Sequence, residues 1–137
     1  IIVDPACGTA GFLVEAGEYL RKNKGDLFLS ENLTEHFNNT MFYGFDMDRT
    51  MLRIGAMNLM QHGIENPNIM YKDSLSEDNE DNGKYTLVLA NPPFKGSIDA
   101  ERTSKDLLAV TKTKKTDRWK MCVYSSRWGF VWKLKCS

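Results

Sequence analysis

Four short apolar segments, each followed at once by a carboxylate or amide side chain, constrain the fold of this chain most. The segments predict strands at about residues 1–4, 41–46, 69–72 and 85–90, and the side chains that end them are Asp4, Asp46, Asp73 and Asn91. Runs of this length, rich in β-branched and aromatic residues, are typical of buried strands. They alternate with segments of helical spacing, which predicts an α/β fold: a parallel sheet with flanking helices and a three-layer core.

Two segments between these strands have the spacing of amphipathic helices. The first begins near Phe12 and fades near Lys24 and Gly25, and the second runs over residues 49–62 and ends at Gly63. The natural N-cap of the second helix is Asp48. Its apolar residues are Met51, Leu52, Ile54, Met57 and Met60. We expect this methionine-rich stripe to pack in the core. Residues 26–40 predict one or two helical turns, and residues 73–84 a surface loop.

The composition is that of an ordinary globular chain, with 42% apolar and 26% charged residues among 137. No apolar run is long enough for a membrane span, and no signal peptide is visible. Cys7, Cys122 and Cys136 are too few and too scattered for a disulfide framework or a zinc site. We therefore expect a cytoplasmic protein without a metal. The first residues read as the inside of a strand, so we expect a fragment whose natural N-terminus lies upstream.

Charge is divided unevenly along the chain. Residues 1–94 hold 7 Lys and Arg against 14 Asp and Glu, and residues 95–137 hold 11 against 4. A basic segment can serve as an electrostatic footprint for nucleic acid. From charge alone, however, a solvated or disordered tail is the favoured interpretation.

The polar side chains at the strand ends predict a ligand site. The carboxyl ends of parallel strands share one edge of a sheet, where ligands bind in open α/β folds. A single Asp after a strand is commonly a helix cap, but four such positions together favour a site. Asp46 could accept hydrogen bonds from ribose hydroxyls, and Asp73 could accept from an adenine amino group or act as a cap or solvated loop residue.

The turn after the first strand is the strongest cofactor element. Gly8 and Gly11 permit positive φ and close approach of a ligand, just before a helix N-terminus. The spacing fits neither the dinucleotide-binding nor the phosphate-loop pattern. Asp4 directly before the turn favours a cationic or hydroxyl-bearing ligand over a phosphate.

The tetrapeptide Asn91-Pro92-Pro93-Phe94 is the most informative short sequence. Its two prolines stiffen the chain, so the Asn91 amide and a proline carbonyl are held as acceptors beside the Phe94 ring. Such an arrangement suits an exocyclic amino group on a planar base. Taken alone, the tetrapeptide could also be an ordinary proline-rich turn.

Residues 4–13 (Asp-Pro-Ala-Cys-Gly-Thr-Ala-Gly-Phe-Leu), followed by residues 91–94, resemble the amino-group class of DNA methyltransferases. Residues 42–46 and 56–64 extend the resemblance to the modification (M) subunit of type I restriction-modification systems, an adenine-N6 DNA methyltransferase family. The resemblance covers about residues 1–115. It implies an incomplete Rossmann-like fold that binds S-adenosylmethionine.

The resemblance also implies a role for each matching residue. The residues implied to bind S-adenosylmethionine are Asp4, Pro5, Ala6, Gly8, Thr9, Gly11, Phe12, Asp46 (at the ribose) and Asp73 (near the adenine). The residues implied to be catalytic are Asn91, Pro92, Pro93 and Phe94. Ala10 stands where many relatives have glycine.

The implied reaction is methyl transfer from S-adenosylmethionine to N6 of a flipped adenine in DNA, as the modification part of a restriction-modification system. The implied partners are double-stranded DNA and the specificity (S) and restriction (R) subunits of a type I complex, with no membrane. Two alternatives stay open: a methyltransferase for another planar amine or amide, such as protein glutamine or another nucleobase, and an inactive fragment. Phe94 favours DNA, because relatives that act on glutamine typically have Tyr there.

The last residues depart from the family pattern. Codons for residues 119–136 can be chosen so that a one-base shift gives a family-like segment that includes Asp-Gly-Val-Leu-Phe-Gly. We therefore expect a partial catalytic domain over residues 1–116 and a divergent tail over 117–137, produced by a frameshift near residues 116–119.

Overall fold

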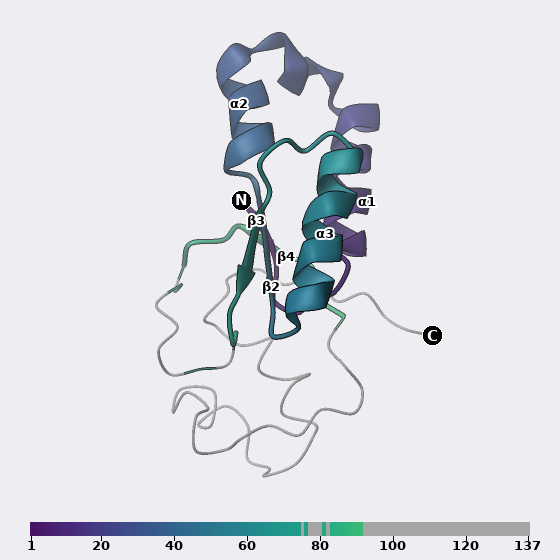
Figure 1. The fold of residues 1–137 in the computed structure, drawn as a ribbon. Coiled ribbons are helices and arrows are strands. Elements are labelled where there is room, and N and C mark those ends of the chain that lie inside the picture. Colours follow the sequence, from purple (N-terminus) through teal and green to yellow (C-terminus); the bar gives the residue numbers. More distant parts are fainter. Residues whose placement is uncertain (75, 77–80, 82, 92–137) are drawn as a thin grey trace, which may run out of the picture.

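The structure, a computed structural model of the whole chain, describes residues 1–74, 76, 81 and 83–91 (Figure 1). The elements of this part are β1 (Ile2–Asp4), α1 (Gly11–Asn23), the 3-10 helix η1 (Gly25–Leu29), α2 (Glu31–Asn39), β2 (Phe42–Asp46), α3 (Arg49–Gln61), β3 (Asn68–Tyr71) and β4 (Leu87–Val88). The first three strands and the two expected helices begin and end within two residues of their predicted bounds. The segment before β2 holds more helix than predicted, because α2 alone spans 9 residues.

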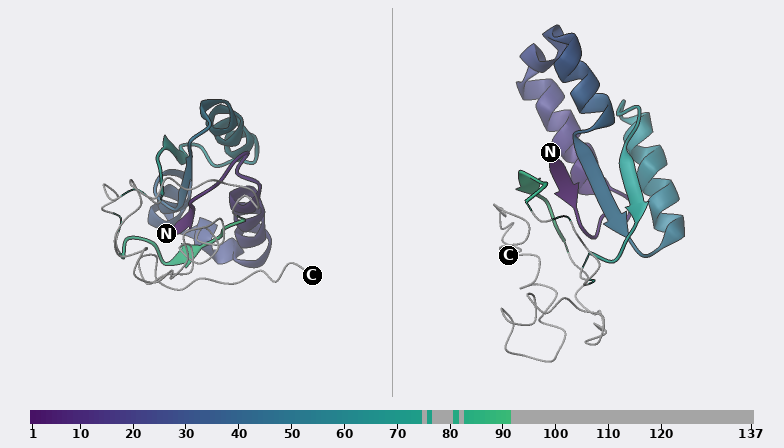
Figure 2. Two further views of the ribbon diagram at one scale, coloured as in Figure 1. Left: turned by 90° about the horizontal axis from the view of Figure 1, so that it is seen from below. Right: turned by 90° about the vertical axis from the view of Figure 1, so that its left-hand side faces the viewer.

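The four strands form one parallel sheet in the order β3-β2-β1-β4 (Figure 2). β1 is an interior strand of this sheet, with β2 on one side and β4 on the other. Strand order therefore reverses between β1 and β4, which is the switch point where open α/β sheets bind ligands beyond the carboxyl ends of their strands.

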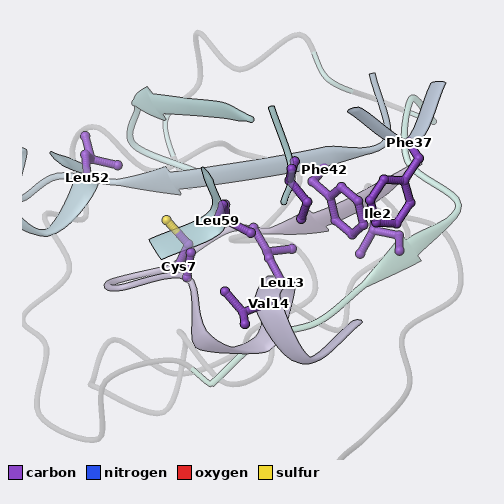
Figure 3. Packing of buried hydrophobic residues seen from close by; sticks show 10 residues of the cluster. Ile2, Cys7, Leu13, Val14, Phe37, Phe42, Leu52 and Leu59 are labelled. Atoms are coloured by element: carbon purple, nitrogen blue, oxygen red, sulfur yellow. The ribbon is translucent and has the colours of Figure 1, made fainter. Parts of the chain in front are cut away.

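The helices pack on one face of the sheet, with α1 and α3 side by side (Figures 1 and 2). Figure 3 shows the core between the helices and the sheet, in which Leu13 and Val14 of α1 lie near Ile2 and Phe42. Phe37 of α2 meets Phe42 edge-on, with ring centroids 5.1 Å apart. This buried cluster fixes where α1 begins, and so it positions the turn between β1 and α1.

The opposite face of the sheet carries a smaller cluster of Val3, Phe45, Tyr85 and Val88. The alternation of strand side chains explains the division, because Val3 points away from the face that holds Ile2. Within the described residues no helix contributes to this second cluster. That part of the chain therefore has two layers, where the sequence led us to expect three.

The methionine-rich stripe of α3 lies on its outer surface, so the prediction that it packs in the core is wrong. The residues of α3 that are buried are Leu52, Gly55 and Leu59, whereas Met51, Ile54, Met57 and Met60 are 37–56% exposed. The four exposed residues recur every three positions, so they run obliquely around the helix and leave the core-facing side. Only Leu52 among the five apolar residues of the predicted stripe faces the core.

The fourth strand, β4, covers only two of the six residues predicted for it, although the residues beside it also bond to the β1 segment. Thr86 and Leu87 donate their N–H groups to the Ile1 carbonyl and so join the start of β1. The Tyr85 side chain lies in the cluster on the second face of the sheet and donates its hydroxyl to Asp81 at 3.2 Å. Across the part of the chain that is described, no helix has the length and apolar character that crossing a membrane requires.

Candidate functional site

The ends of β1 and β2 bring two of the predicted acids to one edge of the sheet. Asp4 pairs in register with Gly44, so Asp46 lies two residues further along the neighbouring strand. The two carboxylates interact electrostatically, since Asp46 contributes to raising the pKa of Asp4. Asp73 follows β3 two residues after Tyr71, which is itself in register with Asp46. The structure thus assembles these three acids along the edge that the strand pattern predicted.

Asp4 is 2% exposed, yet it is a carboxyl group. Burial raises its pKa to about 7, opposed by a hydrogen bond from the Ala6 N–H to Oδ1 and assisted by Asp46. No cation pairs with Asp4 among the residues that the structure describes. A buried carboxylate without a counter-charge is costly, so a cationic group placed beside it would be favoured.

The turn after β1 adopts a left-handed backbone at two places. Gly8 has φ 52° and Ala10 has φ 62°, whereas Gly11 begins α1 and is not in that region. Of the two glycines that permit a positive φ, only Gly8 adopts one, and the turn uses Ala10 immediately before the helix. Glycine adopts this conformation more easily than alanine, so Ala10 is the strained residue of the turn.

Asp46 holds the turn as well as ending β2. Its Oδ2 accepts a hydrogen bond from the Gly8 N–H at 2.9 Å, and its Oδ1 accepts one from the Asp48 N–H at 2.9 Å. Asp48 in turn caps α3 by accepting from Thr50 and Met51, as the sequence predicted. A carboxylate has about four acceptor positions, so both oxygens of Asp46 retain capacity for a ligand.

The remaining residues of the β1–α1 turn leave open space beside its backbone. Pro5 is buried, Ala6 and Phe12 are half-buried, and Thr9 and Gly11 are exposed. A Cβ added to Gly8 or Gly11 would meet nothing within 4 Å, so there is open space beside both residues. The first turn of α1 has neither a side-chain cap nor an acidic residue. These features fit a ligand that lies against the loop and offers a negative group to the helix N-terminus.

Helix α3 contributes two residues that the sequence analysis did not single out. Gly55 lies directly against the turn, and the Asn58 side chain donates to the Thr9 carbonyl at 2.9 Å. In the sequence, residues 56–64 stood out only because they resemble a family segment, and this resemblance does not assign a role to Asn58.

The segment after β3 is more buried than the surface loop that we predicted. Ser74 is 4% exposed and donates to the Pro5 carbonyl at 2.6 Å, which ties this segment to the first turn. Asp81 is 6% exposed, and its carboxylate pairs with Lys72 and Lys84. Burial alone would raise the pKa of Asp81, but hydrogen bonds from the two lysines outweigh it and lower that pKa.

Asn91 is exposed and follows β4 on the far side of β1 from Asp46. The Leu89 N–H donates to the Val3 carbonyl, so Asn91 lies just past the level at which β1 ends. Pro92, Pro93 and Phe94 lie outside the described residues. In the described residues no group of three or more His, Cys, Asp or Glu could hold a metal ion.

The sequence of this chain matches those of known proteins. A sequence model of the family described as N-6 DNA Methylase matches residues 1–127. The chain is 32% identical over 120 residues to the type I restriction enzyme EcoKI methylase subunit of Escherichia coli K12, covering 83% of this chain and 22% of that protein. It is 37% identical over 106 residues to the MjaIX methylase subunit of Methanocaldococcus jannaschii, covering 77% of this chain and 17% of that protein.

Solved structures agree with the sequence relatives. The crystal structure of the EcoKI M protein matches with a TM-score of 0.73 at 28% identity, covering 92% of this chain and 27% of that one. A modification subunit of a type I restriction enzyme from Vibrio vulnificus matches with a TM-score of 0.66 at 26% identity, covering 90% and 25%. The chain spans about a fifth of the curated relatives that it matches. The EcoKI and MjaIX relatives are methylase subunits of type I restriction enzymes, and this chain belongs to the N-6 DNA methylase family.

Proposed function

We propose that this chain carries the cofactor site and the start of the catalytic motif of an adenine-N6 DNA methyltransferase. The observation that carries the proposal is the meeting of the β1–α1 turn with Asp46 at the switch point of the sheet, with Asn91 following β4 on the other side of β1. Membership in the N-6 DNA methylase family supports the same assignment.

The residues of the turn fit S-adenosylmethionine in charge and in space. Asp4 lacks a cationic partner in the described part of the chain and would face the positive groups of the cofactor. Asp46 has acceptor capacity left for ribose hydroxyls, and Asp73 lies further along the same edge, where an adenine amino group could reach it. The uncapped first turn of α1 would receive the carboxylate of the cofactor. The other residues of the proposed cofactor site are Pro5, Ala6, Gly8, Thr9, Gly11 and Phe12.

S-adenosylmethionine would supply an electrophilic methyl group when bound. Asn91 would accept a hydrogen bond from the N6 amino group of adenine, and so would the Pro92 carbonyl, while Pro93 stiffens the motif and Phe94 stacks on the base. Positioning of N6 does most of the work, because the neutral amino group needs no strong base beforehand. The adenine would have to leave the DNA stack to reach these residues.

The whole reaction belongs to a longer protein, since this chain spans about a fifth of its relatives. We propose that this protein acts in the cytoplasm on double-stranded DNA with specificity (S) and restriction (R) subunits of a type I complex. Its relatives are methylase subunits, which supports methyl transfer as the reaction class. Another subunit would read the DNA target.

Calorimetric titration of the 137-residue chain with S-adenosylmethionine tests the cofactor assignment. We expect saturable binding with one site per chain. ATP is the matched control, because it carries the same adenosine but replaces positive groups with phosphates, which Asp4 and Asp46 would repel. The proposal fails if the chain is folded by circular dichroism and binds neither S-adenosylmethionine nor S-adenosylhomocysteine.

A further inference from the structure

The turn between β1 and α1 needs support from outside itself. Gly8 and Ala10 both lie in the left-handed region, with only Thr9 between them. For Ala10 this conformation is unfavourable, since its Cβ crowds the backbone. A short segment with two such residues keeps its shape only if neighbouring elements fix its peptide groups.

Strand β2 supplies the first set of supports. The Cys7 N–H donates to the Phe45 carbonyl at 2.9 Å, and the Gly8 N–H donates to the Asp46 carboxylate. Both bonds hold the first half of the turn. Neither reaches the peptide group that joins Thr9 to Ala10, directly before the first turn of α1.

Helix α3 supplies the support for that peptide group. The Asn58 Nδ2 donates to the Thr9 carbonyl at 2.9 Å, across 49 residues of sequence. On the other side of the same peptide, the Ala10 N–H donates to the Cys7 carbonyl at 2.7 Å. The Thr9–Ala10 peptide is therefore held at both its oxygen and its nitrogen. These two bonds fix the orientation of the last peptide group before α1.

Gly55 allows α3 to come close enough for this contact. A Cβ at Gly55 would lie 3.0 Å from the Gly8 carbonyl oxygen and 3.3 Å from the Ala10 Cβ. Gly55 precedes Asn58 by three residues on the same face of α3, so both residues contact the β1–α1 turn. A side chain at Gly55 would push the helix and the turn apart and lengthen the Asn58 hydrogen bond.

We infer that Asn58 is a positioning residue for the cofactor turn and that Gly55 provides the close approach that it requires. This inference rests on the proposed function, because it assigns the turn to S-adenosylmethionine. The part of the ligand affected is the aminoacyl end, whose carboxylate would lie against the first turn of α1. The adenosine end, which would contact Asp46 and Asp73, depends less on the Thr9–Ala10 peptide.

Asn58→Leu removes the donor and keeps the branched shape of the side chain, and Gln61→Leu removes an amide at an exposed position one turn later on α3. In the ligand-free chain we expect amide exchange at residues 7–12 to rise about 10-fold in Asn58→Leu and to stay at the wild-type rate in Gln61→Leu. We expect affinity for S-adenosylhomocysteine to fall about 10-fold in Asn58→Leu, with adenosine affinity changed less than about 2-fold.

Gly55→Ala is the independent probe, since it keeps Asn58 but adds the methyl group that would separate helix and turn. It should show the same split: faster exchange in the turn and weaker S-adenosylhomocysteine binding, with adenosine affinity retained. A uniform rise in exchange over the whole chain, or an equal loss of both ligands, would show that Asn58 only stabilises the fold and would overturn the inference.

The exchange measurement separates the two hypotheses. If the wild-type chain binds no S-adenosylhomocysteine while exchange in the turn still rises in Asn58→Leu, α3 holds the turn but the cofactor assignment fails, and the positioning role fails with it. If the wild type binds and Asn58→Leu matches it in both exchange and affinity, the positioning role alone is overturned.

Discussion

At the scale of single residues, the unusual group is Asp4, a carboxyl that is buried beside the acid at the end of the next strand. Its burial is an energetic cost that the fold bears before any ligand arrives. Core residues of this kind are uncommon unless they are paired, so in the site that we propose Asp4 would favour a positively charged group on the ligand. Cys7 is also buried, which raises the pKa of its thiol to about 12, so it packs as a small apolar residue.

Asp4→Asn should change how stability depends on pH. In the folded chain the pKa of Asp4 is about 7, above its unfolded value of 3.8, so unfolding releases a proton between these values. The free energy of unfolding should therefore fall as pH rises from about 4 to 7, by roughly 4 kcal/mol at most. Asp4→Asn lacks this ionisation and should be the more stable protein at pH 8. Urea titrations of both proteins from pH 4 to 8 measure the difference, and parallel curves would contradict it.

Asp46→Ala should weaken S-adenosylmethionine binding about 10-fold or more, because charge-assisted hydrogen bonds contribute roughly 1.5–3 kcal/mol each. Part of the effect would come through the turn, since Asp46 also accepts from Gly8. Asp48→Ala is the matched control, because it removes the α3 cap without touching the turn. It should lower the melting temperature and leave the affinity unchanged. An unchanged dissociation constant in Asp46→Ala would remove Asp46 from the site.

At the scale of elements, β2 fits closely against both the turn and β3. A Cβ at Gly44 would lie 2.6 Å from the Ile69 Cδ1 and 2.9 Å from the Cys7 Sγ, closer than side chains can approach. Gly44 therefore sets the spacing between the sheet and the segment that follows β1. A larger residue would displace Cys7, and with it the hydrogen bond that starts the turn.

Gly44→Ala should destabilise the chain by about 1–3 kcal/mol, the usual cost of overpacking. Gly25→Ala is the matched control, because a Cβ there would meet nothing within 4 Å and its φ is not in the left-handed region. It should change stability by less than about 1 kcal/mol. Thermal unfolding followed by circular dichroism compares the two variants. Equal melting temperatures for the two would show that β2 can move away from Cys7.

The elements show how far the sequence could predict this fold. The acids that end β1 and β2 were readable because an apolar run followed by Asp marks a strand end in a parallel sheet. The outer position of Met51 and Met57 was not readable, because several registers of α3 bury some apolar residues, and only packing against β2 and β3 selects the face of Leu52. The contact of Asn58 with Thr9 was also hidden, since it joins segments 49 residues apart.

At the scale of the whole molecule, the site depends on the sheet holding four strand ends in order. β1 brings Asp4 between Asp46 on one neighbour and Asn91 after the other. The cofactor residues that we propose thus lie on one side of the switch point, and the described part of the catalytic motif lies on the other. The methyl group would have to be transferred across this boundary.

In a complete methylase subunit that contains this segment, Asn91→Ala should reduce methyl transfer about 100-fold or more while cofactor affinity is retained. The loss falls on the chemical step, because Asn91 would accept most strongly from N6 as this nitrogen becomes positive. Tritiated methyl transfer to unmodified DNA, measured beside a cofactor titration of the same preparation, tests this. Activity within a few-fold of the parent would make Asn91 only a turn residue.

The domain boundary that we propose near residue 116 makes a prediction about the gene. If residues 117–137 arise from a frameshift, the codons for residues 119–136 read one base out of phase should spell a segment that includes Asp-Gly-Val-Leu-Phe-Gly. Sequencing the coding DNA on both strands decides this. A shifted reading that gives no such segment would show that the tail is encoded as it stands.

The interior place of β1 has a consequence for the order in which the chain acquires structure. Among the strands of this sheet β1 comes first in the chain, and it gains its second neighbour only when Leu87 and Val88 are synthesised, 85 residues later. Contacts so distant in sequence form slowly, because a large loop must close first. Until then the backbone groups of β1 on that side stay unpaired, as on an edge strand. Nascent chains that stop before residue 87 should therefore bind chaperones and form aggregates, whereas chains that extend past Val88 should escape both.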